Sequence, residues 1–334
     1  MPHRRPHHPA TLLKRATCLG AILGVSFGAS FEAAAQSYPN RPIRIVVPYL
    51  PGGAADAVPR LVAQKLGEAF NQSVVMENKA GANTNIGAEF VAKSRPDGYT
   101  LLAASPAMAL NVSLYQKIPY DVLKDFSPII LTGTSANVLI VETSFPAKTL
   151  KELIAAAKAK PGALTFGSGG NASSAHLSGE LMKHMAQVDM VHVAYKGGAP
   201  VVTDLLGGRI SMYFSSLPQG LPLIKAGKVR ALAVTSEKRG LSAPDIPTMS
   251  EAGLPGYSVT AWHGFLTPAG TPQDIIVRLN TEIARLALET ELKGRLEAQG
   301  IDLVAGSPAQ FGAFLKAEID KYATLVKVAD IKAD

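Results

Sequence analysis

The sequence predicts an α/β fold with two lobes, and three observations support this prediction. Short β-branched runs alternate with segments of helical periodicity, which is typical of parallel sheets covered by helices on both faces. The alternation occurs in two series, and the second begins near residue 138. A chain of 334 residues also exceeds the size of one comfortable hydrophobic core.

Residues 1–35 have the pattern of a secretory signal peptide and are set apart from the fold. Basic residues precede an apolar run at 16–29, and Ala33-Ala34-Ala35 offers small residues at a cleavage site. We therefore expect cleavage after Ala35 and a periplasmic mature chain that begins at Gln36. The apolar run is shorter than the roughly 20 residues of a membrane span, so a retained anchor is the weaker alternative.

Charge and cysteine usage narrow the function. Excluding residues 1–35, with four basic residues and one acidic residue, lowers the formal charge from +7 to +4. That charge is spread without clusters, so a nucleic-acid partner is not expected. The only cysteine, Cys18, lies early in the apolar run, which argues against lipidation and leaves the mature chain without thiol chemistry.

The first series of elements opens the mature chain. It is predicted to contain strands at 43–47, 73–77 and 99–103 and helices at 54–70 and 85–93. The second series is predicted to contain strands at 138–141, 164–166, 190–193, 211–214 and 231–235 and helices at 150–160, 173–186 and 199–206.

The end of the chain is expected to return to the first lobe. Residues 258–267 form an extended apolar stretch, and residues 272–328 are helical with breaks at Gly300 and at 306–308. The predicted lobes are therefore residues 36–137 with 259–334, and residues 138–258. Extended strands between them are expected to act as a hinge.

Two glycine-rich loops are the candidate binding elements, one in each lobe. The first spans residues 48–56 and the second residues 167–174, and each joins a strand to a helix. A strand, a glycine loop and a helix N-terminus together favour an anion, because unpaired N–H groups and the helix dipole meet there. The alternative is structural: tight βα turns also use glycine, and Asp56 and Ser173 are good N-caps without any ligand.

Catalytic and cofactor patterns are scarce, so no enzyme, cofactor or metal is expected. Residues 167–172 match a weak dinucleotide motif, but the following strand ends without the required acidic residue. His176 and Glu180 share a helix face at i,i+4, and a hydrogen-bonded pair is favoured over a metal site. Hydrolysis or lyase chemistry at Ser168, Ser173 or His176 is the enzymatic alternative, and it lacks a visible base with an orienting group.

The remaining motifs identify a family by resemblance. In chain order they are Tyr38-Pro39, Arg41-Pro42-Ile43, Pro51-Gly52-Gly53 with Asp56, Glu77-Asn78-Lys79-Ala80-Gly81, Asn85-Ile86-Gly87-Ala88, Pro96-Asp97-Gly98-Tyr99-Thr100, Pro119-Tyr120-Asp121, Asp125-Phe126, Gly167-Ser168, His176-Leu177, Gly179-Glu180, Tyr195-Lys196-Gly197, Asp204-Leu205-Leu206-Gly207-Gly208, Pro247-Thr248, Glu251-Ala252-Gly253 and Pro268-Ala269-Gly270-Thr271-Pro272. Together, over residues 38–330, they resemble the Bug-type receptors, which are the substrate-binding proteins of tripartite tricarboxylate transporters.

The resemblance implies a type II periplasmic-binding-protein fold with the ligand clamped between two lobes. It also implies an organic acid ligand, held largely by backbone amides and waters of the two loops, and delivery to the membrane permease subunits of a tripartite transporter. A sensor kinase is the alternative partner, and a monomer is expected. The chain departs from the pattern at Ala54-Ala55, Asn83-Thr84 and Ala172, so the resemblance leaves the identity of the acid open.

These considerations give one set of candidate ligand contacts. The set is Tyr49, Gly52, Gly53, Ala54, Ala55, Asp56, Thr84, Ser105, Ser168, Gly169, Asn171, Ala172, Ser173, His176, Tyr195, Lys196 and Ser215. Lys196 would add positive charge, and Tyr49 would either wall the ligand or simply pack. Trp262 is expected to pack at the hinge rather than to contact ligand.

Overall fold

A computed structural model gives the fold of the chain. It describes residues 38–51, 54–171, 173–195, 197–240, 242–298, 300–328 and 331. At Ala54, Ala55, Ala57 and Val328 only the backbone is described. The signal-peptide prediction therefore lies outside the described residues. Within them, no helix is long and apolar enough to cross a membrane.

The first series of predicted elements is confirmed. The structure has β1 (Ile43–Val47), α1 (Ala54–Phe70), β2 (Val74–Asn78), η1 (Ala82–Thr84), α2 (Asn85–Ala92), β3 (Thr100–Ala104) and α3 (Pro106–Leu114). In β1, Ile45 and Val47 belong to one hydrophobic cluster and Val46 to another, so the strand is buried on both faces. Because such a strand is buried on both faces, its residues form a nearly continuous apolar run in the sequence.

The second series is also confirmed in outline. It contains β4 (Phe126–Glu142), α4 (Leu150–Ala159), β5 (Thr165–Ser168), α5 (Ser174–Ala186), β6 (Val191–Ala194), α6 (Gly198–Leu206), β7 (Met212–Ser216), α7 (Leu217–Lys225) and β8 (Val229–Val234). The chain then continues through β9 (Thr260–Pro268), α8 (Gln273–Ala287), α9 (Thr290–Ala298), β10 (Asp302–Leu303) and α10 (Pro308–Val328).

Two long strands join the parts of a mixed sheet. Its order is β2-β1-β3-β9-β4-β7-β5-β6, and β10 and β8 also pair with β4. Strands β1, β2 and β3 are mutually parallel, and so are β5, β6 and β7, as the alternation with helices predicts. Strands β4 and β9 run antiparallel to each other and to their other partners, which the alternation did not predict.

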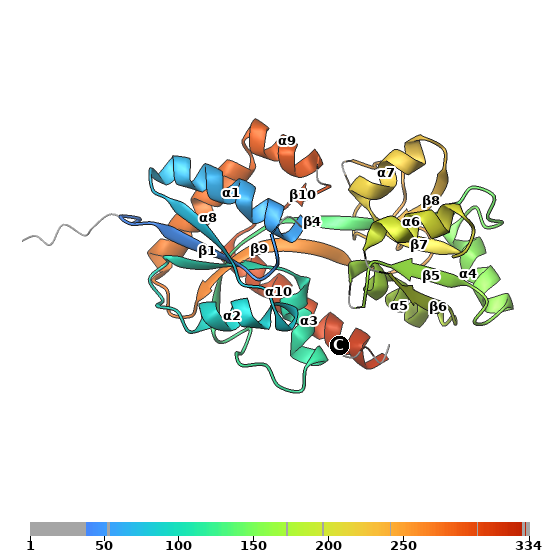
Figure 1. The fold of residues 1–334 in the computed structure, drawn as a ribbon, viewed down its shortest axis with the longest axis horizontal. Helices are drawn as coiled ribbons and strands as arrows, with labels where there is room; N and C mark the ends of the chain where they lie inside the picture. The colour runs from blue at the N-terminus through green and yellow to red at the C-terminus, as the bar shows by residue number, and fades with distance from the viewer. Residues whose placement is uncertain are drawn as a thin grey trace, which may run out of the picture. The chain divides into compact units, whose positions relative to one another are not determined.

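Strand β4 changes partners along its length. Residues 126–136 pair with β9, whereas residues 137–142 pair with β7 and β8. We call β1, β2, β3, β9, β10 and residues 126–136 of β4 the first half-sheet. We call β5, β6, β7, β8 and residues 137–142 of β4 the second half-sheet. Figure 1 shows β4 as the long strand that runs from the first half-sheet into the second, with β9 alongside it and α4–α7 around the second half-sheet.

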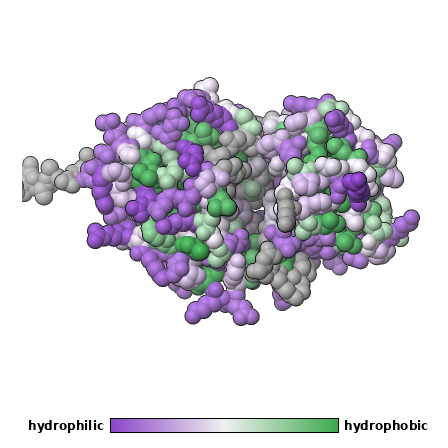
Figure 2. Space-filling model, viewed as in Figure 1, coloured by the Kyte–Doolittle hydropathy of each residue, from purple (hydrophilic) through white to green (hydrophobic). Residues whose placement is uncertain are grey.

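Hydrophilic side chains gather over much of the visible face, with smaller hydrophobic areas between them (Figure 2). The large aromatic and branched side chains lie inside, where Trp262, Phe166, Phe214 and Phe265 are fully buried. This segregation matches the dominant role of apolar burial in folding.

Close packing of α5 on β5 gives a first prediction. A Cβ atom added at Gly179 would lie 2.1 Å from Cε2 of Phe166, which is fully buried. Because the overpacked ring has to move, we expect Gly179→Ala to lower the free energy of unfolding by about 1–3 kcal/mol. Urea unfolding measures this loss.

The matched control is Gly294→Ala, since Gly294 lies in α9 and an added Cβ meets nothing within 4 Å. That variant should gain about 0.5–1 kcal/mol from helix propensity. Equal stability changes in the two variants would contradict the packing argument.

Candidate functional site

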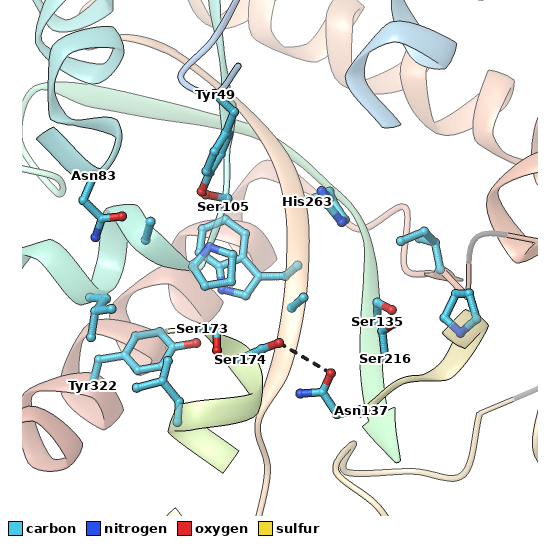
Figure 3. A pocket seen from close by; sticks show the side chains of 18 of the residues that line it. Tyr49, Asn83, Ser105, Ser135, Asn137, Ser173, Ser174, Ser216, His263 and Tyr322 are labelled. Atoms are coloured by element: carbon cyan, nitrogen blue, oxygen red, sulfur yellow. Dashed lines mark hydrogen bonds between the residues drawn. The ribbon is translucent and has the colours of Figure 1, made fainter. Parts of the chain in front are cut away.

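One pocket gathers side chains from both half-sheets. Its volume is about 650 Å³, within the usual range of small-molecule sites. The first half-sheet contributes residues from the ends of β1 and β3 and from β9, and the second contributes residues that begin α5 and α7. Figure 3 shows Tyr49, Ser105, Ser173, Asn137 and Ser216 around this space.

Three helices begin at the pocket. Ser105 and Pro106 open α3, Ser173 and Ser174 open α5, and Ser216 is the N-cap of α7, and all of them line the pocket. Helix N-termini carry free N–H groups and roughly half a positive charge each, so they attract anions. Both α3 and α7 have proline in the first two positions, which is favourable there because the N–H of such a residue would be unpaired in any case.

The N-cap serines use their hydroxyls in different ways. Ser173 caps α5, because its Oγ accepts a hydrogen bond of 3.3 Å from the backbone N–H of His176. Ser105 and Ser216 make no side-chain capping bond. The N-termini of α3 and α7 therefore lack the capping oxygen that would otherwise compete with an acceptor in the pocket.

Tyr49 is fixed over the start of α3. Its hydroxyl lies 2.5 Å from Oγ of Ser105, which is buried. Burial raises the pKa of Tyr49, so its hydroxyl remains protonated and neutral at physiological pH. Figure 3 shows the two hydroxyl groups turned toward each other at the upper part of the pocket.

Asn137 lies where β4 changes partners. Its backbone N–H donates to Oγ1 of Thr235 over 2.8 Å, and its Oδ1 accepts from Oγ of Ser174 over 3.4 Å. Its Nδ2 donates to Oγ of Ser178 over 3.3 Å. The side chain thereby holds the start of α5 against the second half-sheet, as the dashed line in Figure 3 indicates.

Aromatic residues form the base of the pocket. Trp262 of β9 is fully buried, packs edge-to-face against Phe311 and Phe314 of α10, and donates from Nε1 to Oε2 of Glu318 over 3.1 Å. Tyr322 of α10 is also buried, and burial together with Glu318 raises its pKa. The indole N–H is thus already used by a protein acceptor, and the base is largely apolar.

The electrostatics of the pocket come from dipoles. No lysine or arginine is among the described residues that line it. His263 lines it, but burial lowers the pKa of its imidazole to about 4, so that ring is neutral at physiological pH. Among the described residues of the lining, the positive potential therefore comes from the N-termini of α3, α5 and α7.

The structure places four of the predicted contacts on this pocket: Tyr49, Ser105, Asn171 and Ser173. Gly52, Gly53, Ala172 and Lys196 lie outside the described residues, and for Ala54 and Ala55 only the backbone is described.

Asp56 and Thr84 are buried away from the pocket lining. Oδ1 of Asp56 accepts from Arg60 over 2.9 Å and from Nδ2 of Asn78 over 3.0 Å. Oγ1 of Thr84 lies 3.4 Å from Nδ2 of Asn111, and its neighbour Asn83 lines the pocket instead.

Ser168, Gly169 and His176 are not on the pocket lining. Oγ of Ser168 is 2.7 Å from Nε2 of His192 and donates to the carbonyl of Gly170 over 2.9 Å. The ring of His176 stacks on that of His192, with centroids 3.8 Å apart and planes 7° apart. The distance from Nε2 of His176 to Oε1 of Glu180 is 3.9 Å, so the predicted pair is longer than a hydrogen bond.

Tyr195 and Ser215 are also absent from the lining. The hydroxyl of Tyr195 donates to Oδ2 of Asp204 over 2.7 Å. Ser215 is buried, and its Oγ donates to the carbonyl of Ser216 over 3.2 Å. Among the described residues, no group of three or more histidine, cysteine or acidic residues is placed to hold a metal.

Sequence reasoning missed several lining residues. Ser174 and Ser216 begin helices, Ser135 and Asn137 lie in β4, and Tyr322 lies in α10. A signal existed for α3 and α7, because a serine followed by proline within two residues and placed after a strand is a helix start. No comparable signal in the sequence connects Tyr322, near the C-terminus, to this pocket. Trp262, which was expected at the hinge and away from the ligand, packs against α10 and lines the pocket.

Comparisons with known proteins agree with the resemblance. A family model described as "Tripartite tricarboxylate transporter family receptor" matches residues 58–331. Protein BugT of Bordetella pertussis is 36% identical over 321 residues, covering 95% of this chain and 98% of BugT.

Two solved structures extend the comparison. R. palustris Rpa4515 with adipate is 37% identical, with a TM-score of 0.73, and the match covers 88% of this chain and 99% of that one. MatC (Rpa3494) from Rhodopseudomonas palustris with bound malate is 30% identical, with a TM-score of 0.69, and the match covers 86% and 100%. Both the two-lobe periplasmic-binding fold and the absence of enzymatic function in this family agree with the expectations from the sequence. The chain therefore belongs to the tripartite tricarboxylate transporter receptor family.

Proposed function

We propose that the protein captures a small organic carboxylate in the pocket between its half-sheets and delivers it to the permease subunits of a tripartite transporter. The ligand classes are dicarboxylates, tricarboxylates, aromatic acids and acidic amino acids. The observation that carries the proposal is the convergence of three helix N-termini on one pocket. Relatives with adipate and with malate bound support the carboxylate class.

The grip on the carboxylate is assigned to backbone N–H groups, waters and serine hydroxyls. The loops at residues 48–56 and 167–174 contribute Tyr49, Asn171 and Ser173, and the starts of α3 and α7 contribute Ser105 and Ser216. Backbone donors need no counter-charge of their own and no rearrangement of long side chains, so they cost little conformational entropy when the ligand binds.

Closure of the two half-sheets on the ligand is part of the proposal. We assign the hinge to residues 137/138 and 258/259, the two points where the chain passes between the proposed lobes. The first lobe comprises residues 36–137 and 259–334, and the second comprises residues 138–258. Support comes from β4, which exchanges β9 for β7 between Ala136 and Asn137. A sensor kinase is the alternative partner, and it would bind the same closed form. Gene neighbours that encode a permease or a kinase would distinguish the two partners.

A thermal-shift screen tests the carboxylate assignment on the mature protein beginning at Gln36. An acid present at about 100 times its Kd should stabilise the folded state by about 2.7 kcal/mol and raise the Tm by several degrees. The corresponding primary amides are the matched controls, because they keep the shape and lose the charge. The proposal would be contradicted if only the amides stabilised the protein, or if no acid in a broad panel stabilised it.

A further inference from the structure

The turn between β5 and α5 brings two side chains to the ligand pocket. Asn171 and Ser173 both line it. The backbone N–H of Ser173 donates to the carbonyl of Gly170 over 3.3 Å, and the same carbonyl accepts from Oγ of Ser168 over 2.9 Å. Ser168 is fully buried. Its side chain therefore supports the part of the turn that lines the pocket.

The hydroxyl group of Ser168 has three hydrogen-bond contacts but only one proton. It donates that proton to the carbonyl of Gly170, which can only accept, and it accepts from the N–H of Gly170 over 3.2 Å. Nε2 of His192 lies 2.7 Å from the same oxygen. Because the hydroxyl proton is already used, Nε2 has to carry a proton and donate it to Ser168. The hydrogen-bond network thus assigns the tautomer of His192.

Stacking holds the ring of His192 in place. Its centroid lies 3.8 Å from that of His176 and 4.9 Å from that of Phe166, and the interplanar angles are 7° and 26°. His176 leads back to the turn, since its backbone N–H donates to Oγ of Ser173 over 3.3 Å. These contacts form a closed circuit, whose members in order are His192, Ser168, Gly170, Ser173 and His176.

Strand β6 and the residues after it support the turn in two ways. The N–H of Tyr195 donates to the carbonyl of Ser168 over 2.9 Å, and the N–H of Gly197 donates to that of Gly169 over 3.0 Å. These backbone bonds hold the side of the turn next to β5. His192, within β6, adds a bond to the hydroxyl of Ser168, and that hydroxyl in turn holds the next residue of the turn.

We infer that His192 is a positioning residue of the ligand site, which holds the turn through the hydrogen bond from its Nε2–H to Ser168. His192 does not line the pocket, so it acts on a ligand only through the turn that carries Asn171 and Ser173. The inference rests on the proposed function and adds a supporting residue to that same site.

Two substitutions separate the hydrogen bond from the stacking. His192→Phe keeps a ring against His176 and Phe166 and removes the donor. His192→Gln removes the ring and keeps an N–H group at the same number of bonds from Cα as Nε2 of histidine. If the hydrogen bond positions the turn, glutamine preserves the site and phenylalanine does not. If packing alone matters, the order is reversed.

Amide hydrogen exchange of the unliganded mature protein, followed by NMR, tests the positioning without any ligand. The N–H groups of Gly170 and Ser173 should exchange about three- to tenfold faster in His192→Phe, the effect of one lost neutral hydrogen bond. In His192→Gln they should stay within about twofold of the unaltered protein. The matched control is Val191→Thr, because Val191 is 47% exposed in the same strand and does not line the pocket. It should leave both rates unchanged.

Isothermal titration measures the consequence for binding. The probes are adipate and malate, the acids in the two solved structures compared above. A probe that binds the unaltered protein should bind about three- to tenfold more weakly to His192→Phe, and within about twofold of the unaltered affinity to His192→Gln. Ser168→Ala should cause a loss similar to that of His192→Phe. The double variant should lose little more, because both changes break the same chain of contacts.

The tautomer is tested in the unaltered protein. Burial lowers the pKa of His192, so its ring is neutral at about pH 7.5. Nitrogen-15 NMR of the imidazole at this pH should show a protonated Nε2 and an unprotonated Nδ1. This measurement needs no variant and stays decisive if His192→Phe fails to fold.

The outcomes separate the inference from the proposed function. An unprotonated Nε2, or equal losses in His192→Phe and His192→Gln, would overturn the inference and leave the carboxylate receptor intact. Unchanged amide exchange in His192→Phe would overturn it as well. Failure of both acids to bind would count against the proposed function, and the exchange rates and the tautomer would still decide the role of His192.

Discussion

Replacing Trp262 by alanine should lower the free energy of unfolding by about 3–5 kcal/mol, the usual cost of truncating a buried aromatic side chain. Trp262 is fully buried and packs against Phe311 and Phe314, at centroid distances of 5.8 and 5.7 Å. The cavity left behind would separate β9 from α10, and α10 carries Tyr322 at the pocket. We therefore expect ligand binding to weaken together with stability, measured by urea unfolding and titration calorimetry.

The hydrogen bond to Glu318 is separable from the packing. Trp262→Phe keeps an aromatic ring but removes the N–H that lies 3.1 Å from Oε2 of Glu318. Leaving a buried carboxylate with one donor fewer should cost about 1–3 kcal/mol. The double variant Trp262→Phe with Glu318→Gln should be less destabilised than the sum of the two single variants, because both remove the same interaction. Simple additivity would show that the bond contributes nothing.

Acidification below pH 6.5 should destabilise the protein progressively down to about pH 4. Burial, with smaller contributions from His192 and Lys183, lowers the pKa of His176 from 6.5 to about 4. Burial also lowers the pKa of His263 to about 4. Between these pH values the unfolded chain binds protons that the folded chain does not, so the unfolded state gains stability as the pH falls. For His176 the loss approaches about 3 kcal/mol at the acid end, at 1.36 kcal/mol for each pKa unit.

Urea unfolding at several pH values between 7.5 and 4 measures this dependence, and His176→Gln should flatten it. Proton NMR of the imidazole resonances reports the folded-state pKa values directly, which keeps the test decisive if His176→Gln unfolds. A pKa near 6.5 for His176 in the folded protein would contradict the prediction.

Local sequence patterns predicted most elements because their signals lie within a few residues. The run at 43–47 and the helical periodicity at 54–70 correspond to β1 and α1 with the predicted bounds. The first part of β4, residues 126–137, was not predicted. It is a central strand whose pairing with β9 joins residues more than 120 positions apart along the chain, and no local pattern records that pairing.

The sequence by itself determined the alternating α/β architecture, the likeness to a receptor family and the helix start at Ser173, because periodicity and N-cap residues act locally. Only the tertiary structure decided which of these features share one pocket. It placed Asn137, Ser216 and Tyr322 on the same pocket lining as Tyr49, and it left Ser168 and His176 off that lining. The physical reason is that a pocket is defined by contacts between distant segments, which depend on strand register and side-chain packing throughout the fold.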